Sequence, residues 1–361
     1  MSFPGAVAQS SNTTNGEASS SARLDTRVPL VNDKKFTIAI ICALKLELDA
    51  VINLLEHNPR TVPHVGKEYG YLSATLAGHD VLLVKPPEYG IVNSALVMQD
   101  IHAQFGKIEL TLLVGVCGGV PQPLNDGEHV SEPIFLGDVI ISNSVVGYMH
   151  AARFGPQGPE LRTATPCRVS AKLQQILGYL GTDHFMKELS LSSKVAMEQY
   201  FGDKKYLCPG EEEDLAFGSA YHHIHRNGCP AGLCSASPPR FCEAARMASC
   251  TALGCDTQHA RRRQPYASRP QLIHVGTYAS GDAVMRNPVL RDSLAQQYRV
   301  LAFDMEGSGV LQLNASCLVI KSVSDYDDSH KHKAWQNYAA ACAASTARVF
   351  VECFYSQFCN P

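Results

Sequence analysis

The chain lacks the features of a membrane or secreted protein. Among its 361 residues no apolar run is long enough to span a bilayer, and its first residues do not combine a basic segment with a following apolar one. A membrane-spanning or secreted protein is therefore not expected, and we predict a cytoplasmic location.

The chain also has no marked excess of positive or negative charge. The chain has 31 Lys and Arg against 34 Asp and Glu, a net charge of −3, and one short basic cluster at Arg261 to Arg263. Nucleic-acid binding requires a basic stripe or face, so we expect neither a nucleic-acid nor a membrane partner. Hydrophobic residues make up 45% of the chain, which suits one large or two ordinary globular domains.

Hydrophobic periodicity is absent from residues 1–34, which are rich in Ser, Asn, Thr and Gly. Such a segment cannot bury enough apolar surface to offset its ordering entropy, so we predict a disordered tail. From Phe36 the run FTIAIIC predicts a buried strand, and Leu44, Leu48 and Val51 then recur at helical spacing. Further alternation of strand-like and helical segments predicts a single α/β domain over residues 35–356.

A segment of about residues 181–269 interrupts this alternation and reads as an insertion. From Cys208 it is dense in Cys, His, Pro, Gly and Arg. Cys229 and Cys234 are separated by four residues, and other cysteines and histidines follow or precede them, but the spacings fit no compact set of zinc ligands well. We expect a poorly ordered surface insertion and no metal site. Because the chain lacks a secretory signal, we expect its 13 cysteines to be reduced.

Acidic residues follow two apolar runs near the carboxyl end of the chain. One run leads to Asp304 and Glu306, and the run from Cys317 leads to Ser324 and Asp325. In an open α/β sheet the carboxyl ends of strands face the ligand cleft, so acids at these positions are placed for chemistry. The alternative is structural, because Asp325 could cap the next segment and Glu306 could begin a helix.

Six short motifs in a fixed order extend this pattern along the chain. They are Ala43-Leu44-x-x-Glu47, VGVCGG at 114–119, GDVIIS at 137–142, ASGD at 279–282, DMEG at 304–307 and SD at 324–325. In this order they resemble the nucleoside phosphorylase and nucleosidase superfamily, and residues 325–344 are similar to the closing segment of its fungal branch. The resemblance implies a three-layer α/β/α fold around a twisted mixed sheet. Oligomers are common in this family, so a homo-oligomer is expected.

The resemblance also implies cleavage of the N-glycosidic bond of purine ribonucleosides. Asp325 matches the general acid that protonates the purine, and Ser324 would orient it. Glu306 matches the carboxylate that binds the ribose hydroxyls, and Met305 would pack against the sugar. These roles suit a reaction that passes through an oxocarbenium-like state.

The identity of the nucleophile separates two activities. Glu47 resembles the water-activating glutamate of the nucleosidases, and Leu113 occupies the position of a phosphate-binding arginine in the phosphorylases. Since a carboxylate repels phosphate but can deprotonate water, hydrolysis to free base and ribose is the expected reaction. Phosphorolysis, with inorganic phosphate as co-substrate, remains the alternative. No cofactor is implied, and the small-molecule partner is a nucleoside.

Further matched residues concern the shape of the binding site. Gly118 and Gly119 would let the backbone approach the ligand closely, beside Cys117 as a packed small residue. The remaining positions that match the base-binding segment are Ser280, Asp282, Val284 and Met285. Where the resembling thioadenosine nucleosidases stack an aromatic ring on the purine, this chain has Val284.

Two other hypotheses remain open. The domain could be a catalytically silent nucleoside-binding module, because related fungal domains resemble parts of larger receptor-like proteins. Alternatively, the unusual composition of residues 227–269 could come from an unspliced or frame-altered stretch that compromises folding.

Overall fold

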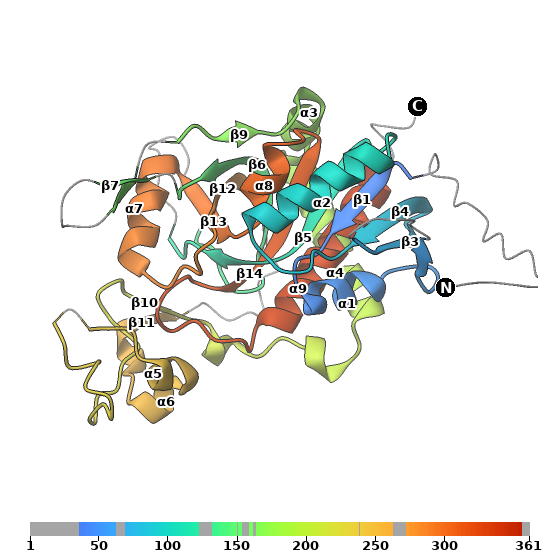
Figure 1. Cartoon of the computed structure of the whole chain (residues 1–361). Coiled ribbons are helices and arrows are strands. Elements are labelled where there is room, and N and C mark those ends of the chain that lie inside the picture. Colours follow the sequence, from blue (N-terminus) through green and yellow to red (C-terminus); the bar gives the residue numbers. More distant parts are fainter. Residues whose placement is uncertain are drawn as a thin grey trace, which may run out of the picture.

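A large mixed β-sheet forms the centre of the protein in the computed structural model (Figure 1). The structure describes residues 36–62, 69–122, 132–149, 151–153, 159–161, 164–237, 239–262 and 272–355. The expected tail at residues 1–34 lies outside these ranges. The expected fold class, α/β with a mixed sheet, is confirmed.

The main sheet has ten strands, and nine of them follow the order β13-β12-β6-β14-β5-β1-β4-β3-β2, with β9 paired to β6. Their bounds are β1 Ile38–Ile41, β2 Arg60–Val62, β3 Tyr71–Leu76, β4 His79–Val84, β5 Leu110–Gly119, β6 Val139–Gly147, β9 Cys167–Arg168, β12 Ile273–Ser280, β13 Val300–Asp304 and β14 Cys317–Asp325. Strands β4, β1, β5 and β14 run parallel to one another. All residues of β1 and β14 are buried, as expected for strands covered on both faces.

Helices cover both faces of this sheet and make three layers. On one face α9 (Gln336–Val349) lies against β5 and β14, and α1 (Lys45–Ile52) and α4 (Asp183–Tyr200) pack against α9. On the other face α2 (Ile91–Gln104) packs against the short α8 (Gly307–Leu311), which touches β6, β12 and β14. The Ala-rich sequence of α9 explains its central place, because small side chains let it approach both the sheet and two helices closely. The chain continues past α9 into a π-helical turn, η5 (Phe350–Tyr355).

One part of the sheet closes on itself. Strand β13 pairs with β12 in parallel and also with β5 in antiparallel fashion, through Ala302 opposite Gly119 and Phe303 opposite Gly118. Strands β13, β12, β6, β14 and β5 therefore form a barrel-like half. The ends of β5, β13 and β14 meet where the chain carries its acidic motifs.

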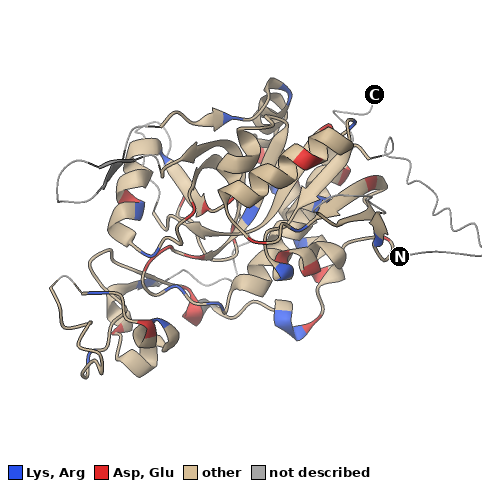
Figure 2. Ribbon diagram, in the orientation of Figure 1, with Lys and Arg blue, Asp and Glu red and all other residues tan. Residues whose placement is uncertain are grey.

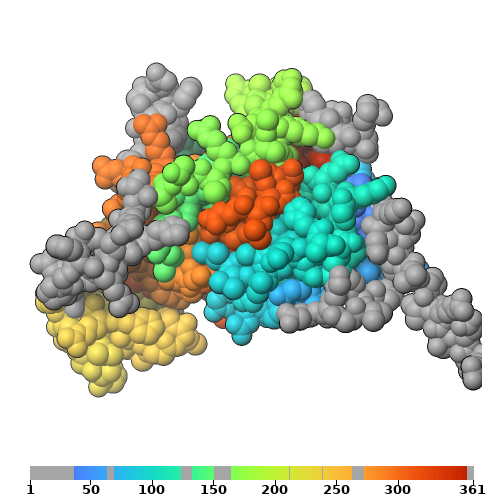
Figure 3. Space-filling view, turned by 45° about the horizontal axis from the view of Figure 1, so that its top comes forward, coloured from blue at the N-terminus to red at the C-terminus, as the bar shows by residue number. Residues whose placement is uncertain are grey.

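The expected insertion, about residues 181–269, has two different parts. Its first helix, α4, belongs to the main body, since Leu189 and Ala196 join the principal hydrophobic core. The later part holds the hairpin of β10 (Leu215–Phe217) and β11 (Ala260–Arg262) and the short helices α5 (Glu243–Met247) and α6 (Cys250–Leu253). Figures 1 and 3 both place α5 and α6 (yellow) at one corner of the molecule.

The other described elements complete the body. They are the hairpin of β7 (Ala151–Arg153) and β8 (Pro159–Leu161), helices α3 (Ala171–Leu180) and α7 (Pro288–Tyr298), and the 3-10 turns η1 (Lys204–Tyr206), η2 (Glu211–Glu213) and η3 (Thr257–His259). Basic and acidic residues are interspersed over the molecule (Figure 2). Among the described helices, none has the length and apolar character needed to cross a bilayer.

Candidate functional site

Glu47, the residue expected to activate water, lies in the first turn of α1 and is only 2% exposed. Its Oε1 accepts a hydrogen bond from the backbone N–H of Val116 at 2.8 Å, and its Oε2 accepts one from the N–H of Leu44 at 2.8 Å. Burial raises the pKa of Glu47 to about 7, although the positive charge of Lys321 opposes the shift. A carboxylate with this pKa can exchange a proton near neutral pH.

Lys321 is one of the residues of this site that the sequence patterns did not predict, together with Asp327 and Lys331. It lies in the middle of β14, is 1% exposed, and places its Nζ 2.6 Å from Glu306 Oε2 and 3.1 Å from Asp304 Oδ2. Burial alone would lower the pKa of Lys321, but the charges of Asp304, Glu306 and Glu47 outweigh it and raise that pKa. Lys321 therefore stays protonated, with the carboxylates of Glu306 and Asp304 in contact with its ammonium group and Glu47 interacting with its charge.

Glu306 follows β13 as expected and is buried. Its Oε1 accepts a hydrogen bond from the N–H of Gly90, at the start of α2, at 3.2 Å. Glu306 thus joins the start of one helix to Lys321 in the central strand. Each carboxylate oxygen keeps a second lone pair with which it can accept a further hydrogen bond.

Asp325 ends β14 opposite Gly118 of β5 and is 6% exposed. The hydroxyl of Ser324 lies 3.0 Å from Asp325 Oδ2 and 3.3 Å from the carbonyl oxygen of Cys117. Ser324 can therefore fix the orientation of the carboxyl group. Burial raises the pKa of the Cys117 thiol well above its usual value, which fits a packed residue rather than a nucleophile.

The loop after β14 adds a second acid and a cation to Asp325. Lys331 Nζ lies 3.0 Å from Asp325 Oδ1 and 3.1 Å from Asp327 Oδ1, and the N–H of Asp327 donates to Asp325 Oδ1 at 3.0 Å. Burial raises the pKa of Asp327 to about 8, with a further contribution from the charge of Asp325, while Lys331 opposes the shift. This cluster therefore holds an exchangeable proton at neutral pH.

Two glycines of β5 make room for these acids. A Cβ atom at Gly115 would overlap the carboxylate of Glu47, and one at Gly118 would overlap the carboxylate of Asp327. Gly119 is restricted by Val323, whose Cγ1 would lie 2.6 Å from an added Cβ. Gly118, expected to let the backbone approach a ligand, thus first lets a buried acid approach the strand.

Replacing Gly118 with alanine should lower the free energy of unfolding by about 1 to 3 kcal/mol, because the added methyl group must displace the buried Asp327. Urea denaturation measures this loss. Gly106→Ala is the matched control, since nothing lies within 4 Å of a Cβ atom there. Equal stability of the two variants would contradict the packing described for Asp327.

The residues matched to the base-binding segment are less closely grouped. Ser280 is fully buried, and its Oγ accepts a hydrogen bond from the N–H of Ser308. Asp282 is exposed, and its Oδ1 accepts a hydrogen bond from the N–H of Ile91 at 2.7 Å. Val284 is 48% exposed, and Met285 packs in a hydrophobic cluster with Tyr148 and Phe303. Met305 is partly buried between Asp304 and Glu306. Roles in ligand binding for these residues stay predictions.

A small cavity of about 20 Å³ lies against the catalytic candidates Ser324 and Asp325. Its other walls come from Leu136, from Glu213 and Leu215 of the insertion, and from five residues of the following loop: Tyr326, Asp328, His330, Lys331 and His332. A larger hollow of about 470 Å³, between α4 and η5, shares none of its lining residues with the acids. The insertion therefore contributes to the surroundings of Asp325.

Seven Cys and His residues of the insertion, together with His330 from the loop after β14, form two compact groups that could hold a metal ion. The first, which we call the insertion site, consists of His225, Cys229, Cys234 and Cys242. The second, the bridging site, consists of His223, Cys250, Cys255 and His330. This order differs from the poorly ordered segment expected from the sequence. The signal that was overlooked is that Cys250 and Cys255 repeat the spacing of Cys229 and Cys234.

Comparison with known proteins agrees with this architecture. The structure is similar to that of a 5'-methylthioadenosine/S-adenosylhomocysteine nucleosidase of Helicobacter pylori in complex with a substituted pyrrolidin-3-ol, with a TM-score of 0.50, 15% identity and coverage of 88% of this chain and 99% of that one. Its similarity to the futalosine hydrolase of Helicobacter pylori has a TM-score of 0.50, 15% identity and coverage of 88% and 98%.

Sequence comparison identifies a longer relative and a family. A nucleotide-binding leucine-rich repeat (NLR)-like protein of Hyaloscypha variabilis is 24% identical over 344 residues, which cover 90% of this chain and 30% of that protein. The chain thus spans about 30% of the length of this relative. The phosphorylase superfamily model matches residues 37–189 and 208–354. The chain belongs to the phosphorylase superfamily.

Proposed function

We propose that the protein hydrolyses the N-glycosidic bond of purine ribonucleosides to free base and ribose. The observation that carries this proposal is Glu47, a buried carboxylate with a pKa of about 7, beside the buried Lys321. The sugar needs a nucleophile as the bond breaks, and a base with this pKa can take a proton from water at neutral pH.

Charge around Glu47 favours water over phosphate as the nucleophile. Asp304 and Glu306 contact the ammonium group of Lys321 and Glu47 interacts with its charge, so a phosphate dianion would meet net negative charge in a buried setting. A neutral water molecule avoids this repulsion.

Glu306 would accept hydrogen bonds from the ribose hydroxyls. Lys321 and the N–H of Gly90 fix its two oxygens, and each oxygen can accept a further hydrogen bond. Fixed acceptors of this kind gain strength as positive charge develops on the sugar ring.

Asp325 would deliver the proton that the departing purine needs. Ser324 and the N–H of Asp327 hold its carboxyl group, and Asp327 retains a proton at neutral pH. When Asp325 in its protonated form gives its proton to the purine, the negative charge remains on Asp325, where Lys331 Nζ, 3.0 Å from Asp325 Oδ1, balances it.

The direct test measures release of free base from a panel of ribonucleosides, with and without inorganic phosphate, and identifies the sugar product. Ribose formed at a rate independent of phosphate supports hydrolysis. Ribose 1-phosphate formed only with phosphate would contradict hydrolysis and establish phosphorolysis.

The pH dependence of activity tests Glu47. Below pH 7 Glu47 is protonated and cannot take a proton from water, so kcat/KM should rise with pH through about 7 as the carboxylate forms. Steady-state rates from pH 5 to 9 measure this limb. Glu47→Gln should remove it and lower kcat by about a hundredfold. The exposed Glu198→Gln on α4 is the control and should keep the wild-type profile. An unchanged limb in Glu47→Gln would exclude this role.

A second candidate function is nucleoside binding without turnover. The observation that favours it is the match to the NLR-like relative, in which the matched region makes up 30% of the protein. Binding of a nucleoside by folded protein, with no product under either phosphate condition, would put this function first.

A further inference from the structure

The outer part of the insertion has very little hydrophobic core. Its buried cluster consists of Cys234, Cys242, Ala245 and Leu253, and the apolar Phe241 and Met247 are 67% and 71% exposed. A unit of this size cannot balance its ordering entropy with so little buried hydrocarbon, and small units of this kind are held by disulfides or metal ions. The segment therefore requires a cross-link.

Disulfides do not supply that cross-link. Cys229 Sγ lies 3.9 Å from Cys242 Sγ, whereas a disulfide requires about 2.05 Å. Every cysteine of the two groups is free. Both groups also include histidine, which takes part in metal binding but not in disulfides.

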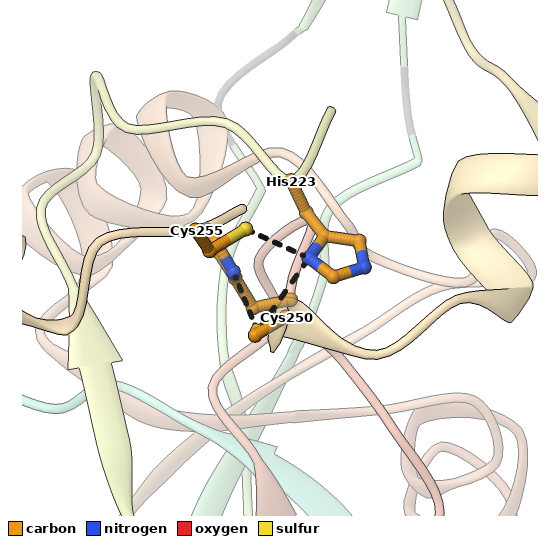
Figure 4. Close-up of side chains that lie close together, drawn as sticks. His223, Cys250 and Cys255 are labelled. Carbon is orange, nitrogen blue, oxygen red and sulfur yellow. Dashed lines mark hydrogen bonds between the residues drawn. The ribbon is translucent and has the colours of Figure 1, made fainter. Parts of the chain in front are cut away.

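The spacing of the ligand atoms fits tetrahedral zinc. Bonds of about 2.3 Å to sulfur and about 2.1 Å to nitrogen, at tetrahedral angles, place neighbouring ligand atoms about 3.5 to 3.8 Å apart. In the bridging site Cys250 Sγ lies 3.6 Å from His223 Nδ1 and 3.5 Å from His330 Nδ1 (Figure 4 shows the first pair), and Cys255 Sγ lies 3.6 Å from His223 Nδ1.

The insertion site has similar dimensions. His225 Nδ1 lies 3.3 Å from Cys234 Sγ and 3.9 Å from Cys242 Sγ. All four ligand atoms of each site lie within 4.8 Å of one another. Four ligands at these distances complete a closed, structural type of zinc site.

Hydrogen bonds hold both histidines of the bridging site in the orientation that a metal needs. His223 Nε2 lies 3.0 Å from the carbonyl oxygen of Ala248, and His330 Nε2 lies 3.0 Å from that of Tyr221. A carbonyl only accepts, so each Nε2 carries the proton and each Nδ1 presents a lone pair toward the thiols. The ring of Phe217 stacks on the imidazole ring of His330, with the ring centroids 3.7 Å apart, and fixes the plane of the imidazole.

We propose that the protein binds two structural zinc ions, one at the insertion site and one at the bridging site, and that the second ion fastens the insertion to the loop after Asp325. Three ligands of the bridging site come from the insertion, and the fourth, His330, lies 80 positions beyond Cys250 in the chain. Mixed thiolate and imidazole ligands in tetrahedral geometry select zinc over calcium or magnesium.

The bridging site lies next to the cluster of Asp325, Asp327 and Lys331. His330 directly precedes Lys331, whose ammonium group touches Asp325 and Asp327. The N–H of His223 donates to Ser329 Oγ at 2.9 Å, which is a second connection between the insertion and this loop. An ion at the bridging site would therefore hold Lys331 against Asp325.

Metal analysis of the purified full-length chain tests the two sites. Protein produced with added zinc should contain about two zinc ions per chain by elemental mass spectrometry. Cys234→Ser and Cys250→Ser should each retain about one ion, and Cys208→Ser, an exposed cysteine of the insertion outside both groups, should retain two. Folded wild-type protein that holds no zinc, or whose intact mass shows disulfides between these cysteines, would overturn the proposal.

If the variants fail to fold, removal of zinc from the wild-type protein still tests the proposal. A chelator that removes the zinc should lower the midpoint of thermal unfolding by several degrees, and zinc should restore it. An unfolding midpoint that chelation leaves unchanged, although the zinc has been removed, would contradict a structural role.

Hydrogen exchange tests the connection to the loop without any assumption about catalysis. Cys250→Ser should increase amide exchange in residues 326–334 by about tenfold, because the loop loses its link to the insertion. Cys234→Ser should leave exchange there close to the wild-type rate. Equal exchange in all three proteins would overturn the link.

Discussion

Replacing Asp325 with asparagine should lower the turnover of a purine ribonucleoside by about a hundredfold or more, the usual scale for loss of a positioned proton donor. Asparagine keeps the shape of the side chain and can keep the hydrogen bond from the N–H of Asp327. Lys331 keeps Asp327 as its partner, so the variant should remain folded. Steady-state release of base, with circular dichroism as a check of folding, measures both effects.

A change of leaving group separates proton delivery from a general loss of activity. A p-nitrophenyl riboside releases an anion that needs no protonation, so Asp325→Asn should lose much less activity with this substrate than with a nucleoside. Asp183→Asn, at the exposed start of α4, is the control and should resemble the wild type with both substrates. Near-normal nucleoside turnover in Asp325→Asn, or an equal loss with both substrates, would exclude the acid role.

The positions of the acids could be predicted because they depend on local patterns. A continuous apolar run followed by an acid predicts a strand whose end lies at the ligand cleft, and Asp325 does end β14. Glu47 is buried despite its place in a helix of mixed polarity, in agreement with the family motif rather than with an exposed helix position.

The partners of these acids depend on contacts between distant segments. Lys321 looks like one polar interruption of an apolar strand, and its acids come from α1 and from the end of β13. The antiparallel pairing of β13 with β5, which closes the barrel-like half, follows from the three-dimensional course of the chain. No local periodicity predicts such a pairing.

The proposed metal ligands are hard to recognise in the sequence because the two sites are interleaved along the chain. His223 belongs to the bridging site and His225 to the insertion site, and His330 comes from another part of the domain. The convergence of all eight residues into two four-ligand groups is not expected from a frame-altered stretch, which would place cysteines without regard to one another. Zinc binding would thus give the unusual composition a folding role.

Replacing Lys321 with methionine should lower the free energy of unfolding by about 3 to 5 kcal/mol, because it leaves the buried Asp304, Glu306 and Glu47 without their cation. Urea denaturation at pH 7 measures the loss. Lys45→Met is the matched control, since this lysine is 82% exposed and pairs with Asp49 at the surface, where such pairs contribute about 1 kcal/mol or less.

The pH dependence of this variant identifies the cause of the loss. Without Lys321, the carboxyl groups of the folded protein should bind protons more tightly than those of the unfolded chain, so stability falls as pH rises from about 4 to 8. The deficit relative to the wild type should therefore be largest near pH 8 and shrink in acid. Adding Glu306→Gln to Lys321→Met removes one unpaired charge and should recover part of the loss at neutral pH. A deficit that is the same at every pH would point to lost packing of the lysine side chain instead of unpaired carboxylates.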